Sequence, residues 1–407
     1  MDLMPIEQVD LLVIGCGPAG VSTALHLVRY DPDWAGRIVM VDKAVHPREK
    51  LCGGGVTHIG HNILARLGLR FDSPHFKIQE VHLAYRSRSV SLRGAPVFRV
   101  VHRNEFDHWL VRVAEERGVG VRQGEAVVHI APTDRHVEVV TTQRVFHARV
   151  VVAADGARSF VRRALKWEGG SQVARALEVL TPEAAHAPEF RDGVAMFDFT
   201  PIGDGLQGYA WEFPSLISGQ PFMNRGVFDS RIRPERSRAD LRQILRESLA
   251  RRGRDLNAYE LKGHPIRWWD RRARFAVPRI LLVGDAAGAD PLMGEGISFA
   301  LGYGQAAASA IADAFERGDF SLATYADRLL AHPLFVQLEA RSRLARLLYG
   351  IGPPLLVGLI WQLVCWRVRL APWRDPAFTL DEPPSVSPVV SHLERNQAAR
   401  AWRGNSR

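Results

Sequence analysis

Cysteine is scarce in this chain of 407 residues. The three cysteines, Cys16, Cys52 and Cys365, lie far apart in the sequence and form no Cys-x-x-Cys pair. Their scarcity excludes a disulfide framework and argues against a metal site built from thiolates. Because 46% of the residues are hydrophobic, the chain can build an ordinary core without crosslinks. We therefore expect a globular protein of two or three structural units, without bound metal, in a reducing cytoplasmic compartment.

A concentrated block of positive charge is also missing. The net charge is +9, but the arginines are scattered along the chain rather than gathered in one run. This distribution argues against a nucleic-acid partner and leaves anionic substrates or an anionic membrane surface to account for the excess charge. The first eight residues lack a basic stretch followed by an apolar one, so we expect no secretory signal.

One long uncharged run is present near the end of the chain. Residues 347–366 contain no charged side chain, and arginines precede and follow them. This length is close to the roughly 20 residues that cross a bilayer. However, Pro353-Pro354 and three glycines interrupt the run. We interpret it as a cover over an apolar pocket or as a peripheral contact with the inner face of a membrane, with a true span as the alternative.

The first part of the chain holds a nucleotide-binding pattern. An apolar run at 9–14 leads into Gly-Cys-Gly-Pro-Ala-Gly, a helical pattern follows, and a second apolar run ends at Asp42. In such a unit Gly15 permits the tight turn, Gly17 lets the backbone approach a pyrophosphate, and Gly20 lets the helix pack close to the strand. Free N–H groups at the helix start bind the anion, and the acid accepts hydrogen bonds from a ribose. The pattern therefore predicts a dinucleotide site.

Two later apolar runs also end in an acid. The sequence ARVVVAADG places Asp155 at the end of a buried strand, and RILLVGDAAG does the same for Asp285. An acid in this position points into the ligand crevice of an open parallel sheet. Pro291, Gly294 and Gly296 then lead into a helix rich in small residues. The N-terminus of that helix can stabilise negative charge on a ligand.

The glycine turn, the sequence ADGARSFVR at 154–162 and the sequence GDAAGADPLMGEG at 284–296 together resemble a known flavoprotein superfamily. That superfamily contains aromatic-ring hydroxylases, flavin-dependent halogenases and geranylgeranyl reductases. The resemblance implies a bound FAD, with Asp285 on its ribityl chain and Arg103 in contact with the flavin. The residues that it assigns to the cofactor site are Gly15, Gly17, Gly20, Asp42, Lys43, Cys52, Gly53, Gly54, Arg103, Asp155, Asp285, Pro291, Gly294 and Gly296.

Two further stretches point to one branch of this superfamily. The loop PREKLCGGG at 47–55 and the sequence YAWEFP at 209–214 are similar to the PxxKxCGGG and YxWxFP sequences of geranylgeranyl reductases. In such reductases the glycine loop runs toward the flavin ring, which implies that Cys52 lies beside the ring. Alternation along a strand puts Tyr209, Trp211 and Phe213 on one face, where they can line a pocket for an apolar chain.

The expected fold is α/β: a discontinuous Rossmann-type FAD-binding domain with an inserted mixed β-sheet substrate domain and a C-terminal helical segment. Alternation at 80–93 predicts a β-hairpin in the insert. Residues 331–375 are expected to be helical and apolar, and residues 376–407 to form a disordered tail. The domain assignments are residues 1–75, 101–170 and 272–330 for FAD binding and residues 76–100 and 171–271 for the substrate.

These features predict flavin-dependent redox chemistry. The main interpretation is an FAD-dependent reductase that saturates carbon–carbon double bonds of a prenyl-type or similar apolar substrate, with Cys52 and Trp211 as candidate catalytic residues. NAD(P)H or a partner reductase would supply the electrons. The alternative is an FAD-dependent monooxygenase that hydroxylates an aromatic or polyketide-like compound, and a flavin halogenase is a further one. Oxygen dependence separates the reductase from the monooxygenase.

Overall fold

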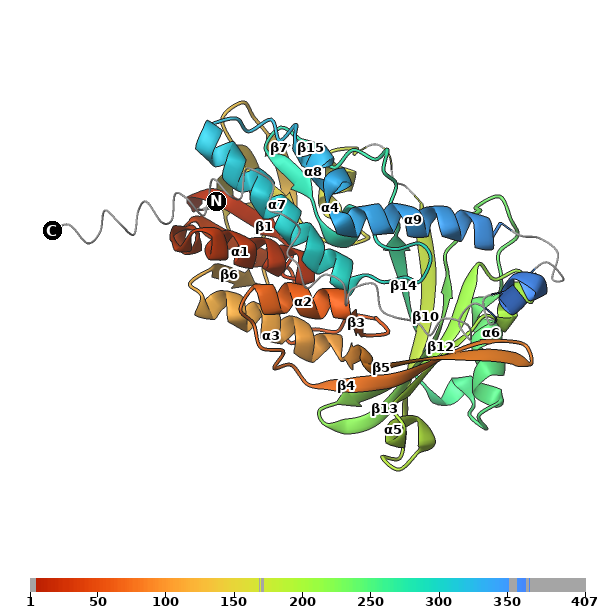
Figure 1. Ribbon diagram of the computed structural model, residues 1–407. Coiled ribbons are helices and arrows are strands. Elements are labelled where there is room, and N and C mark those ends of the chain that lie inside the picture. Colours follow the sequence, from red (N-terminus) through yellow and green to blue (C-terminus); the bar gives the residue numbers. More distant parts are fainter. Residues whose placement is uncertain (1–4, 168, 170–171, 351–356, 364–365, 367–407) are drawn as a thin grey trace.

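The described part of the chain folds into two eight-stranded β-sheets, each with its own helices (Figure 1). The structure is a computed structural model that describes residues 5–167, 169, 172–350, 357–363 and 366. Sheet A contains the N-terminal strand, and sheet B lies at the other end of the molecule. The tail predicted at 376–407 falls outside the described residues.

Sheet A is mainly parallel. Its central order is β15–β16–β9–β1–β2–β6, and all of these strands except β15 run in the same direction. Strands β7 and β8 extend from β9 by antiparallel pairing. The central strands are almost wholly apolar because both faces of a parallel sheet are covered. The strands are β1 (Ile6–Ile14), β2 (Ile38–Asp42), β6 (Gly120–Gln123), β7 (Val127–Pro132), β8 (Val137–Thr141), β9 (Val145–Ala153), β15 (Ala276–Val277) and β16 (Ile280–Leu282).

Sheet B is a mixed sheet with the order β14–β10–β13–β12–β11–β4–β5–β3. Its pairs are antiparallel except for β11 with β4. The antiparallel pairing of β4 with β5 confirms the predicted hairpin. The strands are β3 (Gly55–Thr57), β4 (His75–Tyr85), β5 (Arg88–Val101), β10 (Val173–Pro182), β11 (Val194–Asp198), β12 (Gly208–Ile217), β13 (Gln220–Asp229) and β14 (Lys262–Arg267). Strand β3 joins this sheet although it lies within the residues assigned to FAD binding.

The helices divide between the two sheets. The N-terminal helix α1 packs against α7, and Ser22 Oγ of α1 donates to the carbonyl oxygen of Leu301 in α7 at 2.6 Å. The predicted α/β fold, a Rossmann-type unit with an inserted mixed sheet, is confirmed. The helices are α1 (Pro18–Tyr30), α2 (His58–Arg66), α3 (Arg103–Glu116), α4 (Phe160–Ala164), α5 (Pro188–Arg191), α6 (Leu241–Ala250), α7 (Ile297–Arg317), α8 (Tyr325–Ala331) and α9 (Pro333–Leu348).

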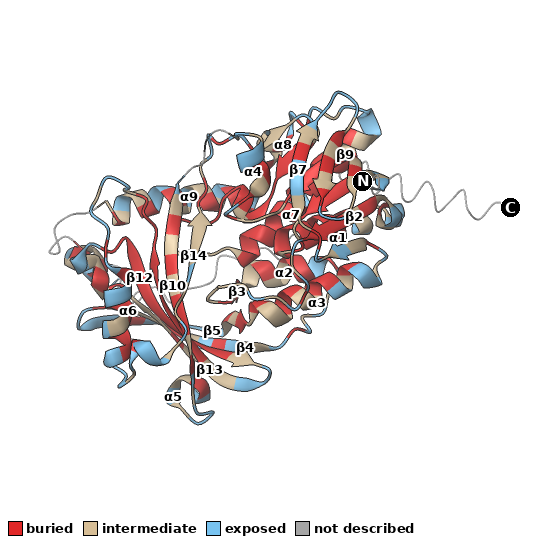
Figure 2. Cartoon of the chain, turned by 180° about the vertical axis from the view of Figure 1, so that it is seen from behind, coloured by how far each residue is buried: buried red, intermediate tan, exposed pale blue. Residues whose placement is uncertain are grey.

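Three apolar cores hold these layers together. The largest joins sheet A to α1, α2, α3 and α7, and Figure 2 shows buried residues along these elements. A second, rich in aromatic rings, lies on one face of sheet B, and a third joins the other face of sheet B to α6. Helix α9 connects the first two cores, because Leu338 belongs to one and Ala345 to the other. It therefore fixes the two sheets to each other.

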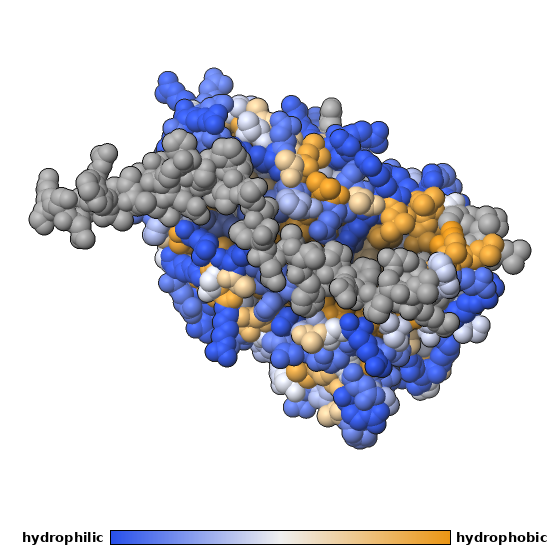
Figure 3. Space-filling view, viewed as in Figure 1, coloured by the Kyte–Doolittle hydropathy of each residue, from blue (hydrophilic) through white to orange (hydrophobic). Residues whose placement is uncertain are grey.

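The uncharged run at 347–366 is described at residues 347–350, 357–363 and 366, and Pro353-Pro354 lies outside the described residues. Residues 357–363 are helical, and Val357 and Trp361 are buried in the aromatic core of sheet B. Five large apolar side chains at this end of the described chain are exposed, two from α9 and three from the last segment: Leu344, Leu347, Leu359, Leu363 and Trp366, which we call the C-terminal apolar patch. Figure 3 shows hydrophobic surface at this end of the molecule. No helix among the described residues has the length and apolar character needed to cross a bilayer.

Candidate cofactor and substrate site

The parallel strands of sheet A end at one edge, where the predicted cofactor residues gather. Gly15 follows β1, Asp42 ends β2, Asp155 comes two residues after β9, and Asp285 lies in the turn after β16. Because these strands are neighbours and parallel, their carboxyl ends share one crevice. The structure thus brings together residues that are far apart in the sequence.

The glycine turn has the shape that a dinucleotide needs. Gly15 has a φ of +105°, and a Cβ there would lie 2.5 Å from the carbonyl oxygen of Ala154. A Cβ at Gly20 would lie 2.2 Å from the carbonyl oxygen of Gly15. At Gly17, by contrast, a Cβ would meet only the guanidinium of Arg48, at 3.7 Å. The backbone at Gly17 therefore faces open space beside a cation, as a pyrophosphate cradle requires.

Asp42 fixes the glycine turn to the neighbouring strand. Its Oδ2 accepts a hydrogen bond from the backbone N–H of Cys16 at 2.8 Å, and its Oδ1 accepts one from Ala44 at 2.9 Å. Each carboxylate oxygen retains a second lone pair for a ribose hydroxyl. Cys16 is fully buried and burial raises the pKa of its thiol, so it acts as a small apolar filler. Lys43, also predicted here, is exposed.

Two more acids complete the crevice. Oδ2 of Asp155 accepts a hydrogen bond from the N–H of Val161 at the start of α4. Its Oδ1 is buried without a hydrogen-bond partner among the residues that the structure describes, and burial raises the pKa of the carboxyl group. Asp285 faces the helix start at Gly296, where a Cβ would lie 3.6 Å from its Oδ1. These oxygens are the hydrogen-bond acceptors that a dinucleotide's hydroxyl groups require.

The segment that follows Asp285 is held by a charged network. Nη1 of Arg341, from α9, donates to Asp290 Oδ2 at 2.8 Å and to Glu295 Oε2 at 2.6 Å. Pro291 is fixed through its carbonyl oxygen, which accepts from Ser230 Oγ at 2.5 Å. Gly294 has a φ of +67°, in the left-handed region that favours glycine. The loop predicted to lie beside the flavin ring is therefore held by side chains from α9 and from the segment after β13.

Arg103 begins α3 and is buried. Its Nε and Nη2 donate to the two carboxylate oxygens of Asp107, each at 2.7 Å, and Arg48 adds a further ion pair to Asp107 at 3.1 Å. Burial lowers the pKa of Arg103, but the negative charge and the hydrogen bonds of Asp107, together with Cys52, raise the pKa by more than burial lowers it. The guanidinium therefore stays charged. Its predicted contact with the flavin remains a prediction, and the structure shows an ion pair beside Cys52.

The loop at 47–55, which contains Cys52, contacts one face of sheet B through side chains of β14. Glu49 forms an ion pair with Lys262 of β14 at 2.8 Å, and Lys50 Nζ contacts Nε2 of His264 on the same strand. Burial lowers the pKa of Lys50, and burial together with the charge of Lys50 lowers the pKa of His264 to about 3. His264 is therefore neutral and can accept the hydrogen bond from Lys50.

Cys52 itself is fixed through its backbone. Its N–H donates to Oε1 of Glu178 on β10 at 3.3 Å, and its carbonyl oxygen accepts from Nδ2 of Asn224 on β13 at 3.0 Å. Oδ1 of Asn224 in turn accepts a hydrogen bond from the indole N–H of Trp211 at 2.8 Å. The sequence prediction named Cys52 and Trp211 but missed Glu178, Asn224 and His264. The available signal for Glu178 was an acid inside the apolar run ARALEVL.

The aromatic residues of β12 form a wall opposite this loop. Tyr209, Trp211 and Phe213 all belong to the aromatic core of sheet B, whereas Ala210, between them, belongs to the core under α6. A Cβ added at Gly53 would lie 3.2 Å from the ring of Phe213 and 3.5 Å from the indole nitrogen of Trp211. The glycine loop and the aromatic wall are therefore in direct contact.

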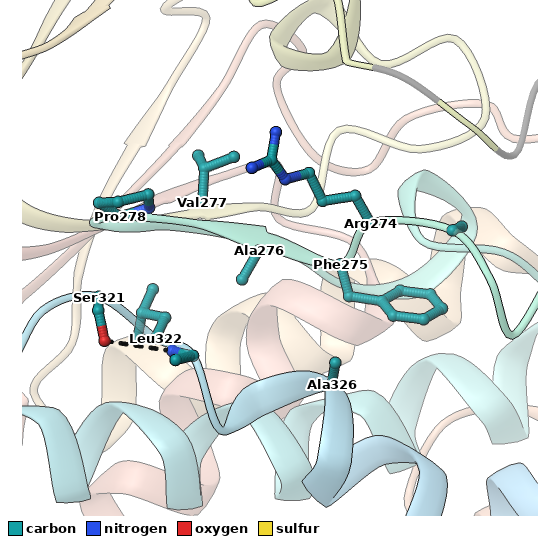
Figure 4. A pocket seen from close by; sticks show the side chains of 10 residues that line it. Arg274, Phe275, Ala276, Val277, Pro278, Ser321, Leu322 and Ala326 are labelled. Atoms are coloured by element: carbon teal, nitrogen blue, oxygen red, sulfur yellow. Dashed lines mark hydrogen bonds between the residues drawn. The ribbon is translucent and has the colours of Figure 1, made fainter.

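A separate hollow of about 230 Å³ lies at the edge of sheet A, beside β15 (Figure 4). Arg274 is the only charged residue that lines it, and none of the predicted site residues does. It contains no carboxylate, thiol or imidazole, so we assign it no part in the chemistry.

Comparison with known proteins agrees with this geometry. The chain is 29% identical over an alignment of 438 positions to a menaquinone reductase of Mycobacterium tuberculosis, covering 98% of this chain and 95% of the relative. It is 27% identical over 346 positions to a digeranylgeranylglycerophospholipid reductase of Thermoplasma volcanium, covering 78% of this chain and 81% of the relative. A solved geranylgeranyl bacteriochlorophyll reductase-like protein of Thermoplasma acidophilum has a TM-score of 0.75 at 21% identity, covering 96% of this chain and 100% of that one.

The open cradle at Gly17, the acids at the strand ends and the unpartnered oxygen of Asp155 fit FAD, so the predicted cofactor is confirmed. The sequence profile described as the FAD binding domain matches residues 8–336, which is most of the chain. The chain therefore belongs to the FAD binding domain family, and it is an FAD-dependent oxidoreductase.

Proposed function

We propose that this protein saturates carbon–carbon double bonds in the isoprenoid chain of an apolar lipid, with prenylated quinones as the first substrates to test. The observation that carries the proposal is the contact between the Cys52 loop and the aromatic wall of Trp211 and Phe213. The names of the menaquinone reductase and of the digeranylgeranylglycerophospholipid reductase support the same class of substrate.

The residues of this chain have distinct parts in the proposed reaction. FAD, once reduced by NAD(P)H or by a partner reductase, supplies the hydride. Because Gly53 and Gly54 lack side chains, the loop backbone can lie directly against the ring of Phe213 and the backbone of Val101, beside the aromatic wall. The rings of Tyr209, Trp211 and Phe213 bind the apolar chain and exclude water from it.

We also propose that the C-terminal apolar patch attaches the enzyme to a membrane surface. Its five large apolar side chains are exposed, and Leu347 is 66% exposed. Arg343, beside it on α9, presents a charged side chain to solvent that can meet anionic headgroups. Because the inner side of the same segment packs into the aromatic core, a lipid substrate entering here would have a short path to the wall.

An oxygen-dependence assay tests the proposed function. The purified flavoprotein is reduced under strictly anaerobic conditions and mixed with a prenylated quinone in detergent micelles. We expect anaerobic reoxidation of the flavin together with a saturated isoprene unit in the product, detected by mass spectrometry. Reoxidation that requires oxygen and yields a hydroxylated product would instead establish the monooxygenase alternative. A matched quinone with a fully saturated chain is the control.

A further inference from the structure

Glu178 occupies an unusual place on β10. In sheet B it pairs with Gly226 on one side and with Lys262 on the other, and Gly226 pairs in turn with Trp211. Paired residues of adjacent strands project from the same face of a sheet. The carboxyl group of Glu178 is therefore on the face that carries Trp211 and that the Cys52 loop covers.

The carboxyl group of Glu178 is buried, and only one of its two oxygens has a hydrogen-bond partner among the described residues. Glu178 is 5% exposed, and Oε1 accepts the hydrogen bond from the backbone N–H of Cys52. Oε2 is buried without a hydrogen-bond partner among the described residues. Such an orphaned oxygen in the interior is rare and costly, and it requires an explanation. A protonated oxygen with a ligand atom beside it would provide one.

The two lysines near the carboxyl group of Glu178 are engaged by other residues. Lys262 is engaged by Glu49 and Glu260, and Lys50 contacts His264. Burial raises the pKa of Glu178 to about 7, although the hydrogen bond from the Cys52 N–H and the positive charges of Lys262 and Lys50 act to lower it. A carboxyl group that holds and releases a proton near neutral pH suits general acid catalysis.

We propose that Glu178 is the proton donor of the double-bond reduction. The inference rests on the function proposed above and names the group that completes it. Saturation of an alkene needs a hydride on one carbon and a proton on the other. Bound FAD in its reduced form would supply the hydride with its two electrons, while the alkene π pair would form the new C–H bond to the proton that Glu178 gives up. The carboxylate that remains takes a proton back from solvent, so atoms and charge balance.

Three other groups on this face are poorer donors. The hydroxyl of Tyr209 donates to the carbonyl oxygen of Met293, and burial raises its pKa far above neutral. Lys50 is engaged by His264, which is itself neutral. The sulfur of Cys52 accepts a hydrogen bond from the N–H of Gly54 at 3.4 Å. Cys52 is the competitor whose backbone contacts Glu178 directly, so the test must include it.

The decisive variants are Glu178→Gln, Glu178→Asp and Cys52→Ala. Glutamine keeps the size of the side chain and the acceptor for the Cys52 N–H but has no acidic proton. Glu212→Gln is the matched control, because Glu212 is a buried carboxylate on β12 that pairs with Arg225 and Arg252 away from the Cys52 loop. Each variant is assayed for bound FAD, for anaerobic flavin reduction, and for reoxidation of the reduced flavin across pH by a prenylated quinol, whose ring is already reduced so that only the double bond can accept the electrons.

We expect Glu178→Gln to bind and reduce FAD normally but to lose at least about 100-fold in the rate of reoxidation by the alkene. The wild-type rate should fall above about pH 7, and Glu178→Gln should lose that dependence while Glu178→Asp keeps it. Infrared spectroscopy of the apo-protein gives a second readout that requires no turnover. We expect the wild type to show the C=O band of a protonated carboxylic acid near neutral pH, and we expect Glu178→Gln to lack this band.

Two results would overturn the inference. One is a normal rate of flavin reoxidation and a normal pH profile in Glu178→Gln. The other is a loss of reoxidation rate in Cys52→Ala as large as that in Glu178→Gln, while the infrared C=O band of the protonated carboxyl group is unchanged. A wild-type enzyme that never reduces a prenyl double bond is a different outcome, because it refutes the proposed function whatever Glu178 does. The FAD content of every variant excludes a trivial loss of cofactor.

Discussion

Gly226 and Trp211 stand directly opposite each other on β13 and β12, and the indole occupies the space that a side chain at 226 would need. A Cβ at Gly226 would lie 2.2 Å from Cζ2 of Trp211 and 2.4 Å from the carbonyl oxygen of Leu177. The indole lies across β13 and donates to Asn224. The aromatic wall therefore depends on a missing side chain in the neighbouring strand.

Gly226→Ala should move the tryptophan and loosen the wall. Because one contact is with backbone, the strand cannot simply relax, and we expect a loss of about 1–3 kcal/mol in the free energy of unfolding. Urea denaturation measures this loss. Gly36→Ala is the control, because a Cβ there meets nothing within 4 Å. Equal stability of the two variants would mean that the indole is free to move away from β13.

The cofactor half of the site could be predicted because its signals are local. The glycine turn, its helix and Asp42 lie within one strand–helix–strand unit, and Asp155 and Asp285 each end an apolar run. Parallel strands then bring these ends together without further information. The fold class followed from the same patterns.

The substrate half could be predicted only in part. Alternation along β12 was enough to place Trp211 and Phe213 on one face. The neighbours Glu178, Asn224 and His264 depend on the register between β10, β13 and β14, which are far apart in the sequence. Nothing within a single strand specifies that register, so their meeting at Cys52 became visible only in the structure.

Glu178 should make the stability of the apo-protein depend on pH. Burial raises its folded-state pKa from 4.5 to about 7, so the folded chain binds more protons than the unfolded chain between these values. The free energy of unfolding should therefore fall as pH rises through this range, by up to roughly 3 kcal/mol. Below the unfolded-state pKa, the carboxyl group is neutral in both the folded and the unfolded protein. The buried charge then no longer lowers the free energy of unfolding.

Glu178→Gln should remove this penalty. We expect the variant to be more stable than the wild type at about pH 8.5 and similar to it at about pH 4, by urea denaturation without FAD. Glu212→Gln should show no such gain, because it removes one ion pair from each of Arg225 and Arg252. Parallel curves for wild type and Glu178→Gln would show that Glu178 is already ionised in the folded protein at low pH.

Asp285→Ala should weaken FAD binding. The substitution removes the predicted acceptor for the ribityl chain, and a hydrogen bond to a charged group contributes about 1.5–3 kcal/mol, or roughly a 10-fold to 100-fold change in Kd. Quenching of flavin fluorescence by the apo-protein measures it. Asp319→Ala, at an exposed site after α7, is the control. Unchanged affinity in Asp285→Ala would remove this residue from the cofactor site.

Arg341→Met should destabilise the loop at 290–296. It leaves the fully buried Asp290 and the neighbouring Glu295 without their cation, and breaking a buried ion pair costs about 3–5 kcal/mol. Burial already raises the pKa of Asp290, and without the opposing charge of Arg341 the carboxyl will take up a proton more readily. Thermal unfolding should therefore show a large loss at neutral pH that shrinks toward acid pH.

A second variant separates this network from an ordinary surface pair on the same helix. Arg343, two residues along α9, makes an exposed ion pair with Glu339 at 3.2 Å. Arg343→Met should therefore cost less than about 1 kcal/mol. Adding Asp290→Asn to Arg341→Met should recover part of the stability. Similar losses for the two single variants would show that the loop does not depend on Arg341.

The C-terminal apolar patch should bind anionic membranes without crossing them. Leu347, Leu359 and Leu363 are exposed, so their change to serine removes apolar surface that lipid would cover and leaves the buried Trp361 in place. We expect the wild type to sediment with vesicles that contain anionic lipid and the triple variant to stay in solution.

Raised salt should release part of the bound wild type, because each basic residue near an anionic surface contributes on the order of 1 kcal/mol. Val128→Ser, at an exposed valine on β7 in sheet A, is a control that removes apolar surface outside the patch. If wild type and triple variant both remain in solution with every vesicle composition, the patch serves another purpose. Binding that resists salt and carbonate and yields only to detergent would instead indicate insertion deeper than a surface contact.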